Sequence, residues 1–225
     1  MRVVCKERGC AMLIVKYTKT GSACYVSHVD TLRTINRTFS RANVSVDYSE
    51  GFNPHMLVFF SPPNAVGVES ECEYFAVSTN DSNDFVNRFN KNAPQGFIAQ
   101  KMWIADKNPN LAKEITRAEY KICGFGIGKI MVESIFDLPE FNVCFKDKNG
   151  EKTKDYKSFV LSAKTMGDNE ICVVLKYGNE NLRPDRFIDG LVQNFGLQQK
   201  DYKITKTKVF ADDLFADDFL DNFVK

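Results

Sequence analysis

Hydrophobic residues recur along the first half of the chain at the intervals of short strands and amphipathic helices. Residues 11–18 (AMLIVKYT) are rich in strand formers and end at the turn signal TKTGS. Ser27 can cap a helix to about Ala42, with apolar residues at helical spacing: Leu32, Ile35 and Phe39. The other predicted elements are strands at residues 44–49, 56–60, 72–79 and 97–105 and a helix at residues 80–90. This β-α-β-β-α-β order, with one additional strand, is the ferredoxin-like pattern.

The second half repeats this order with a weaker first helix. Strands are predicted at residues 118–124, 141–145, 171–177 and 202–210, with helices at residues 127–136 and 184–195. A charged hairpin region lies between the second and third of these strands, and residues 107–114 are the predicted linker. We therefore expect an α+β protein with two tandem ferredoxin-like (βαββαβ) domains, residues 1–108 and 115–210.

The last segment, residues 211–225, is predicted to form an acidic amphipathic C-terminal helix. It contains five Asp and one Lys. Its apolar side chains share one side of a helix (Leu214, Phe215, Phe219, Leu220 and Phe223), and its acidic ones share another (Asp213, Asp217 and Asp221). The apolar side must be buried, either against its own domain or in a basic groove of a partner.

Charge and cysteine content narrow the class of protein. The net charge of +1 indicates no partner by itself. Seven cysteines, an odd and widely spaced set without a CxxC pair, argue against a disulfide framework, so most should be reduced and buried. No apolar run approaches the roughly 18–20 residues of a membrane span, and the N-terminus lacks the apolar stretch of a secretory signal. We expect a cytoplasmic protein without a membrane partner.

Candidate chemistry concentrates between residues 27 and 73, which contain the only two histidines, His28 and His55. His28 lies in the first turn of a predicted helix, where the positive helix end favours a neutral imidazole that could act as a base. His55 follows Asn53-Pro54 and is held in a stiff turn. Both histidines could instead be hydrogen-bonded structural residues. We expect them to converge on one pocket.

The helix that begins near Ser27 carries Arg33, Arg37 and Arg41 at four-residue spacing. Guanidinium groups suit bidentate binding of phosphate, so an anionic ligand such as RNA is one explanation. A solvated helix face, or ion pairs with nearby carboxylates, is the other. A metal site built from both histidines with Cys72 or Glu73 lacks a close-spaced ligand pair, so no metal is expected. Phosphate-loop and CxxxCxxC motifs are absent from the sequence.

The stretch from KYTKTGSACYVSHVDTLR to SPPNAVGVESECEY resembles a bacterial family of radical SAM-linked proteins. The hallmarks of that family are phrases like F-S-H-L-D-x-x-R, Y-S-x-G-F-N-P-H-P and P-x-G-x-x-S-x-x-E-Y. The matching residues here are Ser27, His28, Asp30, Arg33, Arg37, Tyr48, Ser49, Gly51, Phe52, Asn53, Pro54, His55, Gly67, Ser70, Glu73 and Tyr74. Departures are Val29, Ser40 and Met56. The specific resemblance covers roughly residues 15–79.

The resemblance implies an accessory protein that accompanies a radical SAM protein in an RNA- or translation-linked modification. Without cluster cysteines, the chain is not expected to be a stand-alone radical SAM enzyme, and no cofactor is expected. The candidate ligand- or RNA-binding residues are Lys19, Arg33, Arg37, Arg41, Tyr48, Ser49, Asn53 and Glu73. The leading hypothesis is an RNA-binding or substrate-presenting partner. The alternatives are a metal-independent ribonuclease-like enzyme that uses His28 and His55, and a pure protein-interaction subunit.

Overall fold

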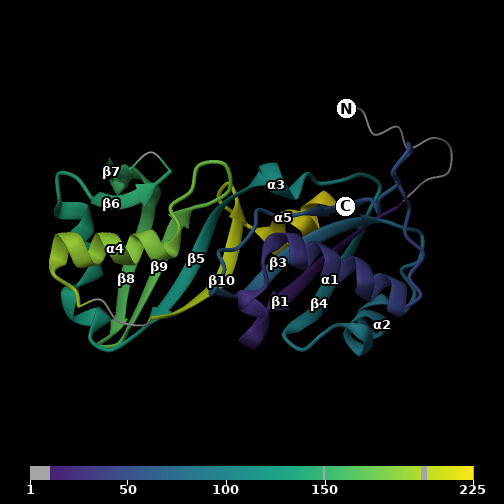
Figure 1. Cartoon of the computed structure of the whole chain (residues 1–225), viewed down its shortest axis with the longest axis horizontal. Helices are drawn as coiled ribbons and strands as arrows, with labels where there is room; N and C mark the ends of the chain where they lie inside the picture. Colours follow the sequence, from purple (N-terminus) through teal and green to yellow (C-terminus); the bar gives the residue numbers. More distant parts are fainter. Residues whose placement is uncertain (1–10, 149, 199–201, 225) are drawn as a thin grey trace. The chain divides into compact units, whose positions relative to one another are not determined.

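The computed structural model describes residues 11–148, 150–198 and 202–224, which form two compact units (Figure 1). The first unit comprises the described residues up to Ile115 together with those from Leu214 onward. The second unit comprises Thr116–Asp213. Strands and helices are present in both units, so the predicted α+β class is confirmed.

The main strands of the first unit are β1 (Met12–Lys19), β2 (Val58–Phe60), β3 (Glu69–Ser78) and β4 (Phe97–Ala105). Its strand order is β4-β1-β3, and the short strand β2 pairs with part of β3. The β1–β3, β1–β4 and β2–β3 pairs are all antiparallel. The strands β1 and β3 each have a partner on both sides and therefore lie in the middle of this sheet.

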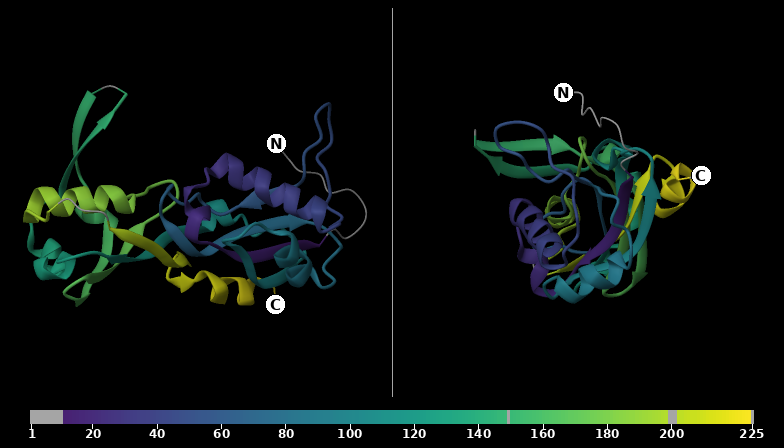
Figure 2. Two further views of the ribbon diagram at one scale, coloured as in Figure 1. Left: turned by 60° about the horizontal axis from the view of Figure 1, so that its bottom comes forward. Right: turned by 90° about the vertical axis from the view of Figure 1, so that its right-hand side faces the viewer.

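Helices cover both faces of this sheet. Figure 2 shows α1 (His28–Arg41) and α2 (Phe85–Asn92) on one side of the strands and α5 (Ala216–Phe223) on the other. Alternate residues of β1 point to opposite faces, as the pleat requires. The core on the α1 and α2 side is formed by apolar residues of these helices and strands, including Leu13, Val15, Ile35, Phe39, Phe75, Phe85 and Phe89. The short elements η1 (Gly21–Tyr25) and α3 (Leu111–Glu114) complete the unit.

In the second unit the strand order is β10-β5-β9-β8. These strands are β5 (Ile115–Cys123), β8 (Val160–Gly167), β9 (Glu170–Lys176) and β10 (Lys203–Ala211). A separate hairpin, β6 (Asn142–Asp147) with β7 (Gly150–Asp155), projects from the unit (Figure 2). The remaining elements of this unit are η2 (Ile127–Ile130), η3 (Val132–Asp137), η4 (Lys157–Phe159) and α4 (Pro184–Phe195). The short strand β11 (Leu214–Phe215) belongs to the first unit.

Several predicted elements match closely. The first helix begins after the Ser27 cap and ends at Arg41, one residue short of the predicted end. The strand at residues 97–105 and the helix at residues 184–195 have the predicted bounds. The strands near residues 11–18, 56–60, 72–79, 118–124, 141–145, 171–177 and 202–210 are present with bounds shifted by one to three residues.

Other predicted elements are wrong. Residues 44–49 form no strand, only an isolated bridge between Tyr48 and Met56, because the Asp47 amide donates instead to Ser78 at the end of β3. The helix predicted at residues 127–136 is two 3₁₀ turns, separated by Met131 in a left-handed conformation that interrupts an α-helix. The predicted helix at residues 80–90 begins only at Phe85, and strand β8 was not predicted at all.

The cysteines only partly follow the prediction that most of them would be buried. Cys24 and Cys72 are buried, Cys123 and Cys172 are half-buried, and Cys144 is exposed; all of these are free thiols. Cys5 and Cys10 lie outside the described residues. Among the helices in the described part of the chain, none combines the length and apolar character needed to cross a membrane.

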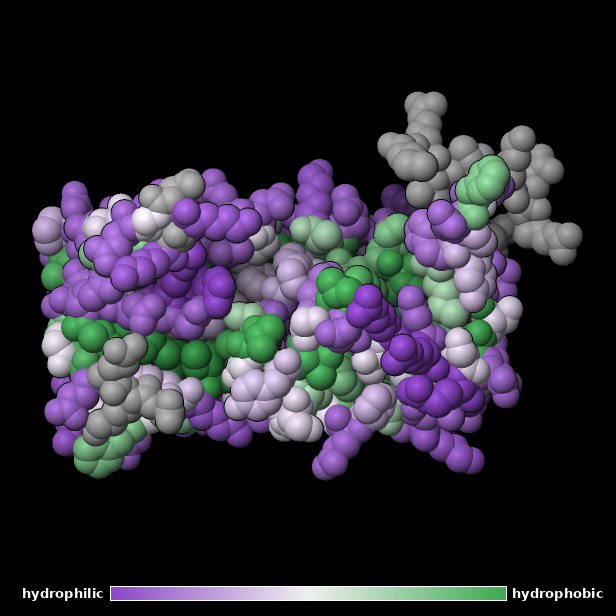
Figure 3. Space-filling model, in the orientation of Figure 1, coloured by the Kyte–Doolittle hydropathy of each residue, from purple (hydrophilic) through white to green (hydrophobic). Residues whose placement is uncertain are grey.

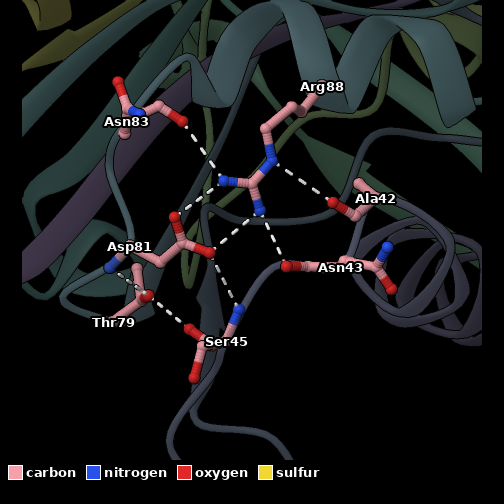
Figure 4. A network of polar contacts seen from close by, with 7 residues as sticks. All are labelled: Ala42, Asn43, Ser45, Thr79, Asp81, Asn83 and Arg88. Carbon is pink, nitrogen blue, oxygen red and sulfur yellow. Dashed lines mark hydrogen bonds and ion pairs between the residues drawn. The ribbon is translucent and has the colours of Figure 1, made fainter.

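Arg88 of α2 links several segments of the helix layer of the first unit by hydrogen bonds (Figure 4). The Arg88 guanidinium donates to both carboxylate oxygens of Asp81, at 2.7 and 2.9 Å. It also donates to the carbonyl oxygens of Ala42, Asn43 and Asn83, at 3.2, 2.8 and 3.2 Å. The end of α1, the segment after β3 and α2 are therefore held by one side chain, and the guanidinium lowers the pKa of the Asp81 carboxyl.

Candidate functional site

A narrow pocket lies at the beginning of α1, above one end of β1 and β3. It is lined by Tyr17 and Lys19 of β1, Glu73 of β3, His28 and Thr31 of α1, and residues 60, 61, 63 and 64. The space has room for about one water molecule. Most of these side chains are polar, so the pocket suits one small polar group of a ligand.

The strand register explains why a lysine and a glutamate enter this pocket. Tyr17 pairs with Glu73 across β1 and β3, and after a register shift Lys19 pairs with Ser70. Lys19 is only 3% exposed and Glu73 only 4%. The Lys19 ammonium donates to the carbonyl oxygen of Val26 at 2.5 Å. Because buried charges are costly unless compensated, two opposite charges in one pocket form a strongly polar site.

The cap of α1 places His28 at the mouth of the pocket. The Asp30 amide donates to the Ser27 hydroxyl at 3.2 Å, and that hydroxyl donates to the Asp30 carboxylate at 2.8 Å. His28 therefore lies in the first helical turn, where its ring meets Phe60 edge-on at a centroid distance of 5.9 Å. The pocket is thus built from a helix start, two strands and the segment that contains Phe60.

Burial against its neighbours is the main reason that the pKa of His28 is lowered. The Lys19 charge lowers this pKa further, whereas the Glu73 charge opposes the shift and raises it. A histidine with a pKa below 6.5 is predominantly neutral at pH 7, so one ring nitrogen can accept a hydrogen bond or a proton.

We predict that the pKa of His28, measured by NMR titration of its imidazole nitrogens, is below 6.5. Replacing Lys19 with methionine should raise this pKa, because a nearby positive charge is removed. Replacing Glu73 with glutamine should lower it, because a negative charge is removed. Lys113→Met, at an exposed site on α3, should leave it unchanged. A wild-type pKa of 6.5 or higher would contradict this account of the pocket.

His55 does not line this pocket. Its Nδ1 atom lies 2.7 Å from the Ser49 hydroxyl, its amide donates to that hydroxyl at 3.1 Å, and its carbonyl accepts from the Ser49 amide at 2.8 Å. The turn with Gly51 at a φ of +128° returns the chain so that these two residues close the loop. The structure therefore does not bring His55 into this pocket with His28, as was expected, and the Ser49 hydroxyl is engaged with His55 in closing the loop.

The three predicted arginines have different environments. Arg33 forms an exposed ion pair with Asp30 at 3.0 Å. Arg41 donates to the Asn92 carbonyl at 2.9 Å, so its guanidinium is engaged in the fold. Arg37 makes no hydrogen bond or ion pair with any residue that the structure describes. Figure 3 shows strongly hydrophilic side chains over the part of the first unit that holds α1 and α2.

Exposed aromatic residues lie in the segments before and after α1. Tyr25 of η1 and Tyr48 are well exposed, and Phe52 is fully exposed at the tip of the loop between α1 and β2. Asn53 is exposed in the same loop. The exposed side chains of the first unit thus include two arginines of α1 and aromatic rings in the segments on either side of it.

Sequence reasoning missed several pocket residues: Tyr17, Thr31, Phe60, Ser61, Pro63 and Asn64. Tyr17 could have been found, because it lies two positions before Lys19 and thus on the same strand face. Asn64 could not, because its loop position depends on tertiary structure. Its amide nitrogen donates to Val68 at 2.8 Å, whereas its buried Oδ1 has no hydrogen-bond partner among the described residues. This oxygen is an acceptor that a ligand could use.

Within residues 11–148, 150–198 and 202–224, no group of three His, Cys, Asp or Glu side chains is placed to hold a metal ion. The pocket brings together His28, Lys19 and Glu73, which can exchange protons and form charge-assisted hydrogen bonds without a metal.

A family model described as "Uncharacterized protein conserved in bacteria (DUF2344)" matches residues 12–184. Among curated proteins, none matches the chain. A solved structure, the acetolactate synthase small subunit from Thermotoga maritima, aligns over 87% of this chain and 93% of that one, with 7% sequence identity and a TM-score of 0.23.

Proposed function

Because the chain belongs to the DUF2344 family of bacterial proteins, whose description names no activity, we propose a function from its surface chemistry: the protein binds single-stranded RNA around α1. The observation that carries this proposal is the combination of exposed Arg33 and Arg37 with the exposed aromatic rings of Tyr25, Tyr48 and Phe52. Guanidinium groups bind phosphates, and aromatic rings stack on unpaired bases. The polar pocket beside this surface could accept a base edge or a ribose hydroxyl.

We further propose that the protein presents the bound RNA to a radical SAM protein. The support for this partner is the resemblance of the Ser27–Arg33 and Tyr48–His55 phrases to the radical SAM-linked family. Two tandem ferredoxin-like domains remain the proposed finer fold. Their support is that each unit places its first and third sheet strands in the middle, in the orders β4-β1-β3-β2 and β10-β5-β9-β8. A cytoplasmic location is part of the same proposal.

The two alternative functions have less support. A ribonuclease with a histidine pair needs both rings at one site, whereas His28 alone lines the pocket and His55 closes a loop. A protein-interaction subunit that docks through the acidic helix needs free carboxylates. Asp217 and Asp221 on α5 are hydrogen-bonded within their own unit. An RNA-binding surface requires neither condition.

We predict that the double variant Arg33→Ala/Arg37→Ala binds a single-stranded RNA about tenfold more weakly than the wild type. The slope of log affinity against log salt should become shallower by about 1.4, since each phosphate contact on a single strand contributes about 0.7. Fold stability should change little, because exposed ion pairs contribute little. Fluorescence anisotropy with a labelled oligonucleotide over a salt series measures both quantities.

The matched control is Lys113→Ala/Lys164→Ala, which removes the same charge from exposed positions elsewhere. This control should keep at least half of the wild-type affinity. If both double variants weaken binding equally, the effect is general electrostatics and the α1 surface is not the binding site.

A further inference from the structure

The sheet face on the opposite side from α1 carries a row of charged and aromatic side chains beneath α5. Lys16 on β1 is the cross-strand neighbour of Tyr74 on β3 and of Lys101 on β4. Trp103 is two residues farther along β4 and so on the same face, with the Lys101 ammonium 4.4 Å from its ring. Like charges opposite each other on adjacent strands repel, so this row requires negative charge above it.

Helix α5 supplies that negative charge. The Asp217 carboxylate accepts from the Lys16 ammonium at 2.9 Å and from the Tyr74 hydroxyl at 2.6 Å. Two oxygens of Asp221 accept from the Lys101 ammonium at 3.0 and 3.2 Å, and one also accepts from the indole of Trp103 at 2.5 Å. Each carboxylate therefore contacts one ammonium and one aromatic donor. Burial raises the pKa of Tyr74, so its hydroxyl stays protonated and keeps donating.

The apolar attachment of α5 is small. The helix has eight residues, and only Ala216 and Leu220 are buried. A helix of this length is marginal in water without tertiary contacts. The outer ion pair is also accessible to solvent, because the side chains of Lys101 and Asp221 are 43% and 47% exposed. Polar contacts that another anion could replace therefore contribute to holding the helix in place.

We propose that this sheet face is a second binding surface for single-stranded RNA, and that α5 occupies it as an acidic internal competitor. The inference rests on the proposed binding of RNA, to which it adds a separate surface. Phosphates take the positions of the two carboxylates above Lys16 and Lys101, and bases stack on the rings of Tyr74 and Trp103. RNA can therefore occupy this face only when α5 leaves it, because the phosphates and the two carboxylates compete for the same lysines.

The first test weakens the competitor without truncating the chain. Asp217→Asn/Asp221→Asn removes both charges that compensate the lysines and keeps the size of each side chain. The matched control is Asp212→Asn/Asp218→Asn, which makes the same charge change at exposed residues. We expect the first variant to bind oligouridylate about tenfold more tightly than the control, because the competent state becomes more populated.

The second readout is the intrinsic fluorescence of Trp103, the only tryptophan in the chain. A base that stacks on this ring should quench its emission. We expect this quenching at moderate salt in the Asp217→Asn/Asp221→Asn variant, and at low salt in the wild type. Adding Lys16→Met and Lys101→Met to the variant should reduce the salt slope by about 1.4, for two lost phosphate contacts. The wild-type titration requires no substitution, so the test does not depend on the folding of a variant.

Equal affinities of the Asp217→Asn/Asp221→Asn variant and its control would overturn the inference. So would RNA binding that leaves Trp103 emission unchanged in both the variant and the wild type, since α5 would then be a fixed cap. Adding Arg33→Ala and Arg37→Ala separates this surface from the one around α1. Persistence of Trp103 quenching supports the second surface even if the α1 surface fails, whereas loss of quenching counts against it.

Discussion

Replacement of Gly96 with alanine is expected to lower the free energy of unfolding of the first unit by about 3 kcal/mol. Gly96 has a φ of +90°, and a Cβ atom there would lie 2.3 Å from the Thr20 carbonyl oxygen and 2.7 Å from the Ala23 Cβ atom. Backbone strain and overpacking each cost about 1–3 kcal/mol. The opposing gain from a stiffer unfolded chain is at most about 1 kcal/mol, so the clash dominates.

The same substitution should disturb the pocket. The Thr20 amide donates to the Gly96 carbonyl at 3.1 Å, and the η1 turn that follows leads to Val26, whose carbonyl holds Lys19. Displacement of this segment should therefore move the pKa of His28 back toward 6.5, because the imidazole gains water. Urea unfolding followed by Trp103 fluorescence measures the stability of the first unit, and NMR titration measures the pKa.

Gly21 provides the matched control for Gly96. It also has a positive φ, +59°, but a Cβ atom there would meet no atom within 4 Å. Gly21→Ala therefore carries the backbone strain without the clash, and we expect a loss of about 1 kcal/mol. If both substitutions destabilise the protein equally, the segment around Thr20 moves away without cost. The short distance between residue 96 and the Thr20 carbonyl would then not contribute to the loss of stability.

Sequence patterns predicted the elements whose local and tertiary preferences agree. The helix after Ser27 has a capping hydroxyl, an acidic first turn and apolar residues that enter the core. The helix from Pro184 has proline in its first turn and Gly196, with a φ of +68°, at its end. For these segments, the hydrophobic periodicity and the signals at the helix ends predict the same helix that tertiary packing stabilises.

The failed predictions are segments where tertiary contacts decide the backbone. Residues 44–49 alternate like a strand, yet the Asp47 amide and carbonyl bond to Ser78 and Leu57 rather than to a continuous partner strand. At Gly128, a Cβ atom would lie 1.8 Å from the Gly167 carbonyl oxygen, so this turn is shaped by close contact with β8. Neither partner can be recognised from the local sequence.

The candidate site was likewise only partly predictable from the sequence. Its polar composition was apparent from the residues between His28 and Glu73, but which of them meet depends on strand register. Lys19 and Glu73 join His28 because β1 and β3 are adjacent, whereas His55 lies in a loop that closes on Ser49. The acidic stripe of the tail was also apparent, but the lysines and aromatic rings beneath it come from three separate strands.

Replacement of Arg88 with alanine is expected to lower the free energy of unfolding of the first unit by about 3 kcal/mol. Five hydrogen bonds are lost, two of them to the Asp81 carboxylate. Bonds with a charged partner contribute about 1.5–3 kcal/mol each, but water can reach side chains that are about a quarter exposed, so the total is smaller than the sum. Arg88→Lys should lose about half as much, because one ammonium cannot reach all these acceptors.

Acid pH provides the discriminating measurement for this network. The pKa of Asp81 is held below its ordinary value of 3.8, so its contribution to stability is complete above about pH 4 and is lost as pH falls below that value. The stability difference between wild type and Arg88→Ala should therefore shrink from pH 4 downward, in urea unfolding monitored by Trp103 fluorescence. The control Lys91→Ala, at an exposed position on the same helix, should change stability by less than about 0.5 kcal/mol at any pH. A difference that stays constant below pH 4 would mean that Arg88 acts through the carbonyl groups of Ala42, Asn43 and Asn83 and not through Asp81.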